Sequence, residues 1–175
     1  EIHNQVVNEH YQGDPFYYYI NQEVYSMGDY VVKPTTITVT DLLPENIELI
    51  PDQNNGPPTY EQAFQLFNAT DPDAPNKDRA MTLTSGVSSF EVTEEKGRQR
   101  ITLTIGRADV QKIYFHSGYF SLRLKVRPTL DPDTIDQRVT MTNSAVVKFF
   151  DTKERYSKET NEVDVHLDPL NRFPA

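Results

Sequence analysis

Two polar residues lie where the strand pattern of this sequence demands apolar ones. Asn143 falls inside an alternating face that is otherwise apolar, made by Val139, Met141, Ala145, Val147 and Phe149. Asp41 closes the face that begins with Ile37 and Val39. Burying an unpaired carboxyl or amide group costs about 1–3 kcal/mol or more, so each residue is expected to have a specific partner.

Two interpretations of these residues stay open. In the structural one, Asp41 caps a turn before Leu42-Leu43-Pro44, and Asn143 hydrogen-bonds a nearby loop. In the chemical one, the two residues face each other, and Asn143 could form an isopeptide bond with a lysine while Asp41 promotes the reaction. Burial would keep Asp41 protonated and hold the lysine amine neutral and nucleophilic, so that it attacks the Asn143 side-chain carbon and releases ammonia. Asp41 would act as the proton shuttle.

Other patterns offer little chemistry. Asp71, Asp73 and Asp78 share one loop, which lacks EF-hand spacing and is better explained as a solvated acidic loop than as a calcium site. The stretch Asp131 to Asp136 is similarly predicted to be a turn. None of the histidines has metal-ligand spacing, and there is no cysteine, so we expect no metal and no cofactor. A glycan-active enzyme would need two carboxylates about 5–10 Å apart, and nothing marks such a pair. The sequence thus predicts a protein that is not an enzyme.

The elements that must position these residues are mostly strands. Alternation predicts strands near Phe16 to Tyr25, Thr36 to Asp41, Val87 to Val92, Ile101 to Ile105, Phe120 to Val126, Val139 to Phe149 and Val163 to Leu167. Residues 60–67 are expected to form a short helix or an irregular connection, and residues 107–115 a short helical crossover. Many strands with little helix indicate an all-β, two-sheet β-sandwich over residues 1–170, followed by a tail at 171–175.

Composition narrows the partners. The formal net charge of -9 argues against nucleic acid, whose phosphates need clustered Lys and Arg. No apolar run is long enough for a membrane span, and no signal peptide is present, so membrane insertion is not expected.

Tyr17, Tyr19 and Tyr25 lie opposite the apolar face of their strand. They could contact a host glycan or protein, although packing against an adjoining domain or loop is favoured.

Four stretches give the chain a family resemblance. They are PFYYYINQEV, ITVTDLLPENIEL, AFQLFNATDPDA, and TNSAVVKFF followed by ETNEVDVHLDP. In order and spacing the chain resembles the C-terminal stalk domains of antigen I/II adhesins of oral streptococci, and more broadly the isopeptide-forming, Cna-type domains of Gram-positive surface proteins. The resemblance implies an immunoglobulin-like sandwich with extra strands and a first-strand lysine bonded to an asparagine near the chain end. By position, Asn143 matches the asparagine, Asp41 matches the promoting carboxylate, and Asn161 is a second candidate asparagine.

The sequence departs from the family in one respect. No lysine lies in the expected first strand, EIHNQVVN. Either the lysine precedes Glu1, or the crosslink is lost and His3 or Asn4 lies near its place. Lys33 adjoins Pro34, and Lys125 and Lys148 point away from the apolar faces of their strands.

The resemblance also implies a function. We expect a monomeric stalk domain of a cell-wall-anchored surface adhesin. Its partners would be the adjacent domains of the same adhesin, and host glycoproteins or the surfaces of other bacteria are further candidates. A host glycoprotein- or glycan-binding domain without a crosslink is the alternative.

Overall fold

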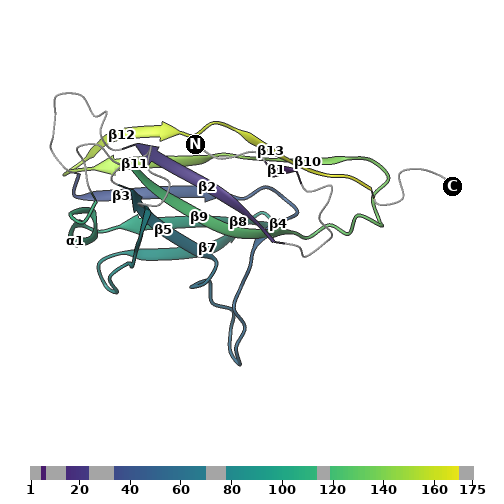
Figure 1. Cartoon of the computed structure of the whole chain (residues 1–175), viewed down its shortest axis with the longest axis horizontal. Helices are drawn as coiled ribbons and strands as arrows, with labels where there is room; N and C mark the ends of the chain where they lie inside the picture. Colours follow the sequence, from purple (N-terminus) through teal and green to yellow (C-terminus); the bar gives the residue numbers. More distant parts are fainter. Residues whose placement is uncertain (1–4, 7–14, 24–33, 70–77, 114–118, 170–175) are drawn as a thin grey trace.

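The computed structural model describes residues 5–6, 15–23, 34–69, 78–113 and 119–169. The predicted all-β sandwich is confirmed, because two five-stranded assemblies face each other and a smaller three-stranded sheet continues from one end (Figure 1). Within these residues the only helix is the short α1, Arg107–Val110.

The first large sheet carries Asp41 at its centre. Its order is β12-β11-β3-β8-β7, all antiparallel. The bounds are β3 Thr36–Leu42, β7 Ser89–Glu95, β8 Arg98–Ile105, β11 Ala145–Phe150 and β12 Glu154–Glu159. Strict alternation in β3 and β11 sends every second side chain into the core, which fixes the register between them.

The second large sheet packs on the first. Its order is β2-β9-β5-β6, with β4 also paired to β9. The bounds are β2 Phe16–Glu23, β4 Ile47–Leu49, β5 Phe64–Ala69, β6 Asp78–Met81 and β9 Tyr119–Pro128. A hydrogen bond of 3.4 Å from Gln22 Nε2 to Tyr156 Oη joins edge strands β2 and β12 of the two sheets.

The third sheet is the three-stranded β1-β13-β10, which carries Asn143. Its strands are β1 Gln5–Val6, β10 Val139–Asn143 and β13 Val163–Leu167. β1 runs parallel to β13, and β13 runs antiparallel to β10. Only Ser144 separates β10 from β11, so the chain passes from the small sheet into the first large sheet at the point where Asn143 lies.

Three expectations about elements need correction. Residues 64–67 belong to β5 rather than to a helix or an irregular connection. The crossover predicted over 107–115 contains helix only at Arg107–Val110, and residues 114–118 lie outside the described part. The strand expected from Val87 begins at Ser89, and Val87 is exposed.

Candidate functional site: a buried carboxyl–amide pair

Asp41 and Asn143 meet inside the sandwich. Asp41 is opposite Ala145 on β11 and Ile101 on β8, while Asn143, at the end of β10, is opposite Val163 on β13. Each side chain belongs to a residue only 1% exposed. Asn143 Nδ2 donates a hydrogen bond of 2.9 Å to Asp41 Oδ2. The structure therefore brings together the two residues that break the apolar pattern, although they are far apart in sequence.

The surroundings of the pair are apolar and raise the pKa of Asp41. Burial raises it to about 7, while the hydrogen bond from Asn143 and the positive charge of Arg98 act in the opposite direction. Arg98 donates from Nε to Leu43 O at 2.8 Å and from Nη2 to Leu42 O at 3.1 Å. Near neutral pH, Asp41 is therefore divided between its protonated and ionised forms.

The pair leaves two oxygen atoms unsatisfied. Asp41 Oδ1 and Asn143 Oδ1 are buried and have no hydrogen-bond partner within the described structure. Because buried polar atoms are nearly always hydrogen-bonded, these two acceptors require an explanation. They can accept hydrogen bonds from a further donor that enters the same site.

The described lysines do not supply that donor. Lys125 is half-buried on the outer face of β9, and Lys148 forms an ion pair of 2.9 Å with Glu154. The prediction that these two lysines point away from the core is confirmed. The remaining lysines with described side chains are exposed, and Lys33 lies outside the described residues.

Asn161, the second candidate asparagine, is exposed in the connection between β12 and β13. The neighbouring Thr160 is buried, and its Oγ1 accepts a 2.7 Å hydrogen bond from the backbone N–H of Ala145. The amide that faces Asp41 belongs to Asn143 alone among the described asparagines.

The other candidate groups lie elsewhere. Asp71 and Asp73 fall outside the described residues, and only the backbone of Asp78, at the start of β6, is described. No cluster of metal-binding side chains occurs among the described residues. His3 and Asn4 also lie outside them. In the described part, no helix has the length and apolar character that crossing a membrane requires.

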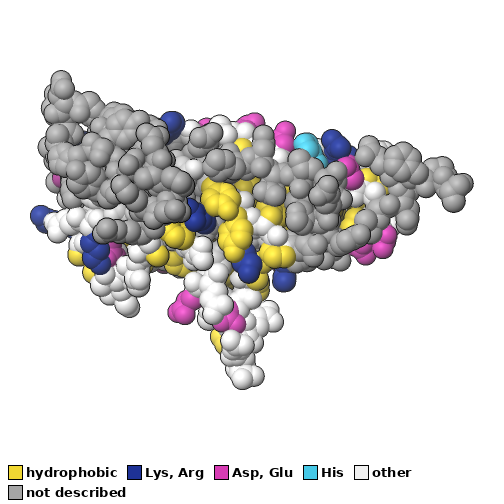
Figure 2. Space-filling model, in the orientation of Figure 1, with side chains coloured by type: hydrophobic (Ala, Val, Ile, Leu, Met, Phe, Trp, Pro, Cys, Tyr) yellow, Lys and Arg dark blue, Asp and Glu magenta, His cyan; other side chains and the backbone are white. Residues whose placement is uncertain are grey.

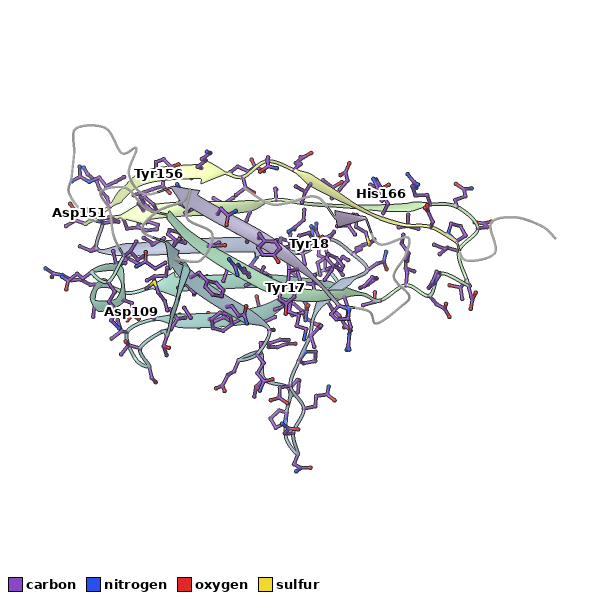
Figure 3. The ribbon with its side chains drawn as sticks, viewed as in Figure 1. Tyr17, Tyr18, Asp109, Asp151, Tyr156 and His166 are labelled. Carbon is purple, nitrogen blue, oxygen red and sulfur yellow. The ribbon has the colours of Figure 1, made fainter. Side chains whose placement is uncertain are left out.

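Sequence reasoning missed a second buried carboxylate, Asp109 on α1 (Figure 3). It accepts hydrogen bonds from the backbone N–H and Oγ1 of Thr84, from Ser88 Oγ and from Lys112 Nζ, at 2.5–2.9 Å. Although burial acts to raise the pKa of Asp109, these donors together hold it well below its usual range. No sequence motif marks this cluster, because its members come from a loop and a short helix.

The outer face of the second large sheet carries aromatic and basic side chains. Tyr17 and Tyr19 have ring centroids 6.2 Å apart, and the Arg123 guanidinium lies 3.9 Å from the Phe67 centroid and 5.3 Å from that of Tyr19. Figure 2 shows hydrophobic and basic side chains next to each other in the middle of the face on which β2 and β9 lie. Tyr25 lies outside the described residues.

Comparison with known proteins places the fold. No family model matches the chain, and no curated protein matches it by sequence. Among solved structures, domains D2 and D3 of the major pilin SpaD from Corynebacterium diphtheriae align over 88% of the chain and 47% of the pilin structure, with a TM-score of 0.57 and 17% identity. The C-terminal domain of the antigen I/II-family protein AspA from Streptococcus pyogenes aligns over 95% of the chain and 42% of its own length, with a TM-score of 0.54 and 12% identity.

A third structure, the N-terminal domain of the Streptococcus gordonii adhesin Sgo0707, aligns over 90% of the chain and 29% of its own length, with a TM-score of 0.53 and 13% identity. The chain spans less than half the length of these structures. At such low identities the likeness shows the fold alone. That fold is the one found in pilins and adhesins of Gram-positive bacteria, including an antigen I/II-family domain.

Proposed function

We propose that this chain is a structural and adhesive stalk domain of a Gram-positive surface adhesin, with Asp41 and Asn143 as the site of an intramolecular isopeptide bond. The hydrogen bond between two fully buried polar groups from different sheets carries the proposal. The fold shared with pilins and adhesins supports the structural role and an extracellular location on the bacterial surface.

The pair suits amide exchange because each partner supplies one requirement. A neutral lysine amine attacks Cγ of Asn143; the Nζ–Cγ bond forms, the Cγ–Nδ2 bond breaks, and Nδ2 leaves as ammonia. Protonated Asp41 gives its proton to the departing Nδ2, which its Oδ2 already contacts, and takes up the proton that the incoming nitrogen loses. The raised pKa of Asp41 supports this role, because the shuttle must hold and release a proton near neutral pH.

The strand register indicates where the lysine must come from. β1 pairs with β13 in parallel, with Gln5 opposite Val165, and Asn143 is opposite Val163. This pairing makes the residues just before Gln5 the segment in which to place a lysine, and we choose position 3 for the test. The sequence has His3 there, which lies outside the described residues. A lysine at this position is therefore the direct test of the site.

The experiment is to introduce His3→Lys and to measure intact mass. We expect a mass lower than the sequence mass by one ammonia, and a tryptic peptide that joins the two strands. His3→Lys/Asp41→Asn and His3→Lys/Asn143→Ala are the matched controls and should keep the full sequence mass. A folded His3→Lys protein that keeps its full mass over days would contradict the proposed site.

A second function, recognition of a host glycoprotein, is favoured by the outer face of β2 and β9. The half-buried Tyr17 and Tyr19 offer rings for sugar stacking, and Arg123 and Lys125 place positive charge beside them, although the chain carries a net charge of -9. This combination fits a glycan that bears carboxylate groups.

Binding to an array of sialylated and neutral glycans tests this second function. We expect wild type to bind acidic glycans, Tyr17→Ser/Lys125→Glu to lose binding, and the edge variant Lys158→Glu to retain it. Absence of binding to every acidic glycan, or equal binding by the first variant, would refute glycan recognition by this face.

A further inference from the structure

Tyr18 places a buried hydroxyl group in the core between the two large sheets. It lies on β2, in the sheet that faces Asp41, and is 0% exposed (Figure 3). Its neighbours Tyr17 and Tyr19 are half-buried and alternate with it along the strand. Its ring packs edge-on against Phe16, with centroids 5.4 Å apart and planes at 77°. For packing alone, phenylalanine would serve as well.

The Tyr18 hydroxyl has no hydrogen-bond partner within the described structure. It shares this condition with several buried side-chain atoms, among them Asp41 Oδ1 and Asn143 Oδ1. Burial is the larger cause of the raised pKa of Tyr18, and the negative charge of Asp41 raises this pKa further. The two groups are therefore close enough to interact electrostatically. The core therefore contains an unsatisfied donor, the Tyr18 hydroxyl, and an unsatisfied acceptor, Asp41 Oδ1, in the two sheets that face each other.

We propose that Tyr18 is a positioning residue of the Asp41–Asn143 site, whose hydroxyl donates a hydrogen bond to Asp41 Oδ1, directly after a small side-chain movement or through one bound water. This inference rests on the proposed function for its consequence, although the contact itself can be tested without it. A donor at Oδ1 leaves Oδ2 as the oxygen that takes the proton. Oδ2 is the atom already in contact with the Asn143 amide.

The assignment fits the other groups that act on Asp41. Within the described residues these are Asn143, which contacts Oδ2, and Arg98, whose Nε and Nη2 donate to backbone carbonyls of Leu43 and Leu42. Arg98 therefore acts on Asp41 through its charge, because its hydrogen bonds in the described structure go to backbone carbonyls. Oδ1 stays available to the Tyr18 hydroxyl.

The first test measures the pKa of Asp41 by carbon-13 NMR of its side-chain carboxyl in wild type, Tyr18→Phe and Tyr17→Phe. A donor to the carboxylate lowers its pKa, so its loss should raise the Asp41 pKa by about one unit in Tyr18→Phe. Tyr17→Phe, on the outer face, should leave it unchanged. A purely structural role for Tyr18 predicts no shift, and an unchanged Asp41 pKa in Tyr18→Phe would overturn the proposal.

A second variant acts in the opposite direction without removing the hydroxyl. Site-specific 3-fluorotyrosine at position 18 makes the phenol a stronger donor and should lower the Asp41 pKa. This keeps the proposal testable even if Tyr18→Phe folds poorly. A rise in the Asp41 pKa, or no change, would count against the contact.

The last test separates this inference from the proposed function. In the His3→Lys background, adding Tyr18→Phe should slow ammonia loss by about tenfold or more and move its pH profile upward with the Asp41 pKa. If His3→Lys forms no crosslink but the Asp41 pKa shifts as expected, the crosslink fails and the Tyr18 contact stands. If the crosslink forms at equal rates with and without Tyr18→Phe, the positioning role fails and the crosslink stands.

Discussion

At the scale of single residues, Asp41 makes stability depend on pH. Its pKa is about 7 in the folded chain and about 4 when unfolded, so the folded chain binds the additional proton between these values. The contribution of Asp41 to stability is thus full below about pH 4 and declines as pH rises through about 7. The physical cause of this decline is that an ionised carboxylate is unfavourable inside the apolar core.

The variant Asp41→Asn removes this dependence and preserves the side-chain shape. We expect the free energy of unfolding of wild type, minus that of Asp41→Asn, to fall by roughly 2–3 kcal/mol between pH 5 and pH 8, as measured by urea unfolding. Asp133→Asn, at an exposed aspartate, is the control and should show almost no such change. Equal differences at the two pH values would show that Asp41 titrates normally.

Asp109 gives the opposite pH dependence. Because the donors around it hold its pKa below the usual range, its contribution is present above about pH 4 and is lost as the pH falls further. At neutral pH, Asp109→Asn should cost about 2–4 kcal/mol in urea unfolding, since several charge-assisted hydrogen bonds are lost. Lys112→Met, which removes one half-exposed partner, should cost less than about 1 kcal/mol. Similar losses of stability in the two variants would contradict the view that the buried donors contribute more than the ion pair with Lys112.

The residue scale also shows what the sequence can and cannot predict. Asp41 and Asn143 stand out because a carboxyl and an amide interrupt apolar alternation. Tyr18 and Asp109 do not stand out. Tyrosine is an acceptable core residue by its ring alone, so its position in the pattern says nothing about its hydroxyl. Asp109 lies in the first turn of the short helix α1, where aspartate is ordinary, and only tertiary contacts reveal its burial.

At the scale of elements, Gly106 determines how α1 meets the loop before β7. A Cβ atom at this position would lie 2.1 Å from the Val87 carbonyl oxygen. Because that neighbour is backbone, it cannot move aside cheaply, and Gly106→Ala should cost about 1–3 kcal/mol or more. Gly56→Ala adds a methyl group in open space and should change stability by less than about 0.5 kcal/mol. Thermal and urea unfolding of both variants test this, and equal stability would contradict the close approach.

Residues 64–67, predicted to be helical or irregular but found in β5, show why local pattern is insufficient. Tyr60, Ala63, Phe64 and Phe67 have the three- and four-residue spacing of a helix. In the structure Phe64 pairs with Leu124 and Phe67 with Ser121, so β5 completes the sheet against β9. Pairing with a strand that is distant in sequence overrides the local preference. β2, β3 and β9 were predictable because their alternation is regular over many residues.

At the scale of the whole molecule, the proposed bond would lie where the small sheet meets the first large sheet. β10 belongs to the small sheet and β11 to the first large sheet, and Asn143 lies where one becomes the other. A covalent link from position 3 to Asn143 would join the start of this sequence to β10. Pulling on the two ends would then bypass residues 4–142, so the strands in that part would carry less of the load, whereas β11, β12 and β13 would still carry it.

The same link should stabilise the domain by limiting its unfolded state. A bond between positions 3 and 143 closes a loop of about 140 residues, for which loop-closure entropy predicts about 5 kcal/mol at 25 °C. In urea unfolding, the free energy of unfolding of crosslinked His3→Lys should exceed that of uncrosslinked His3→Lys/Asn143→Ala by about this amount. The difference between wild type and Asn143→Ala measures the lost hydrogen bond and is subtracted first. If the crosslink forms with its ammonia loss but adds no stability, strain in the native sandwich must offset the entropy gain, and the bond would then lack the stabilising role expected of a stalk.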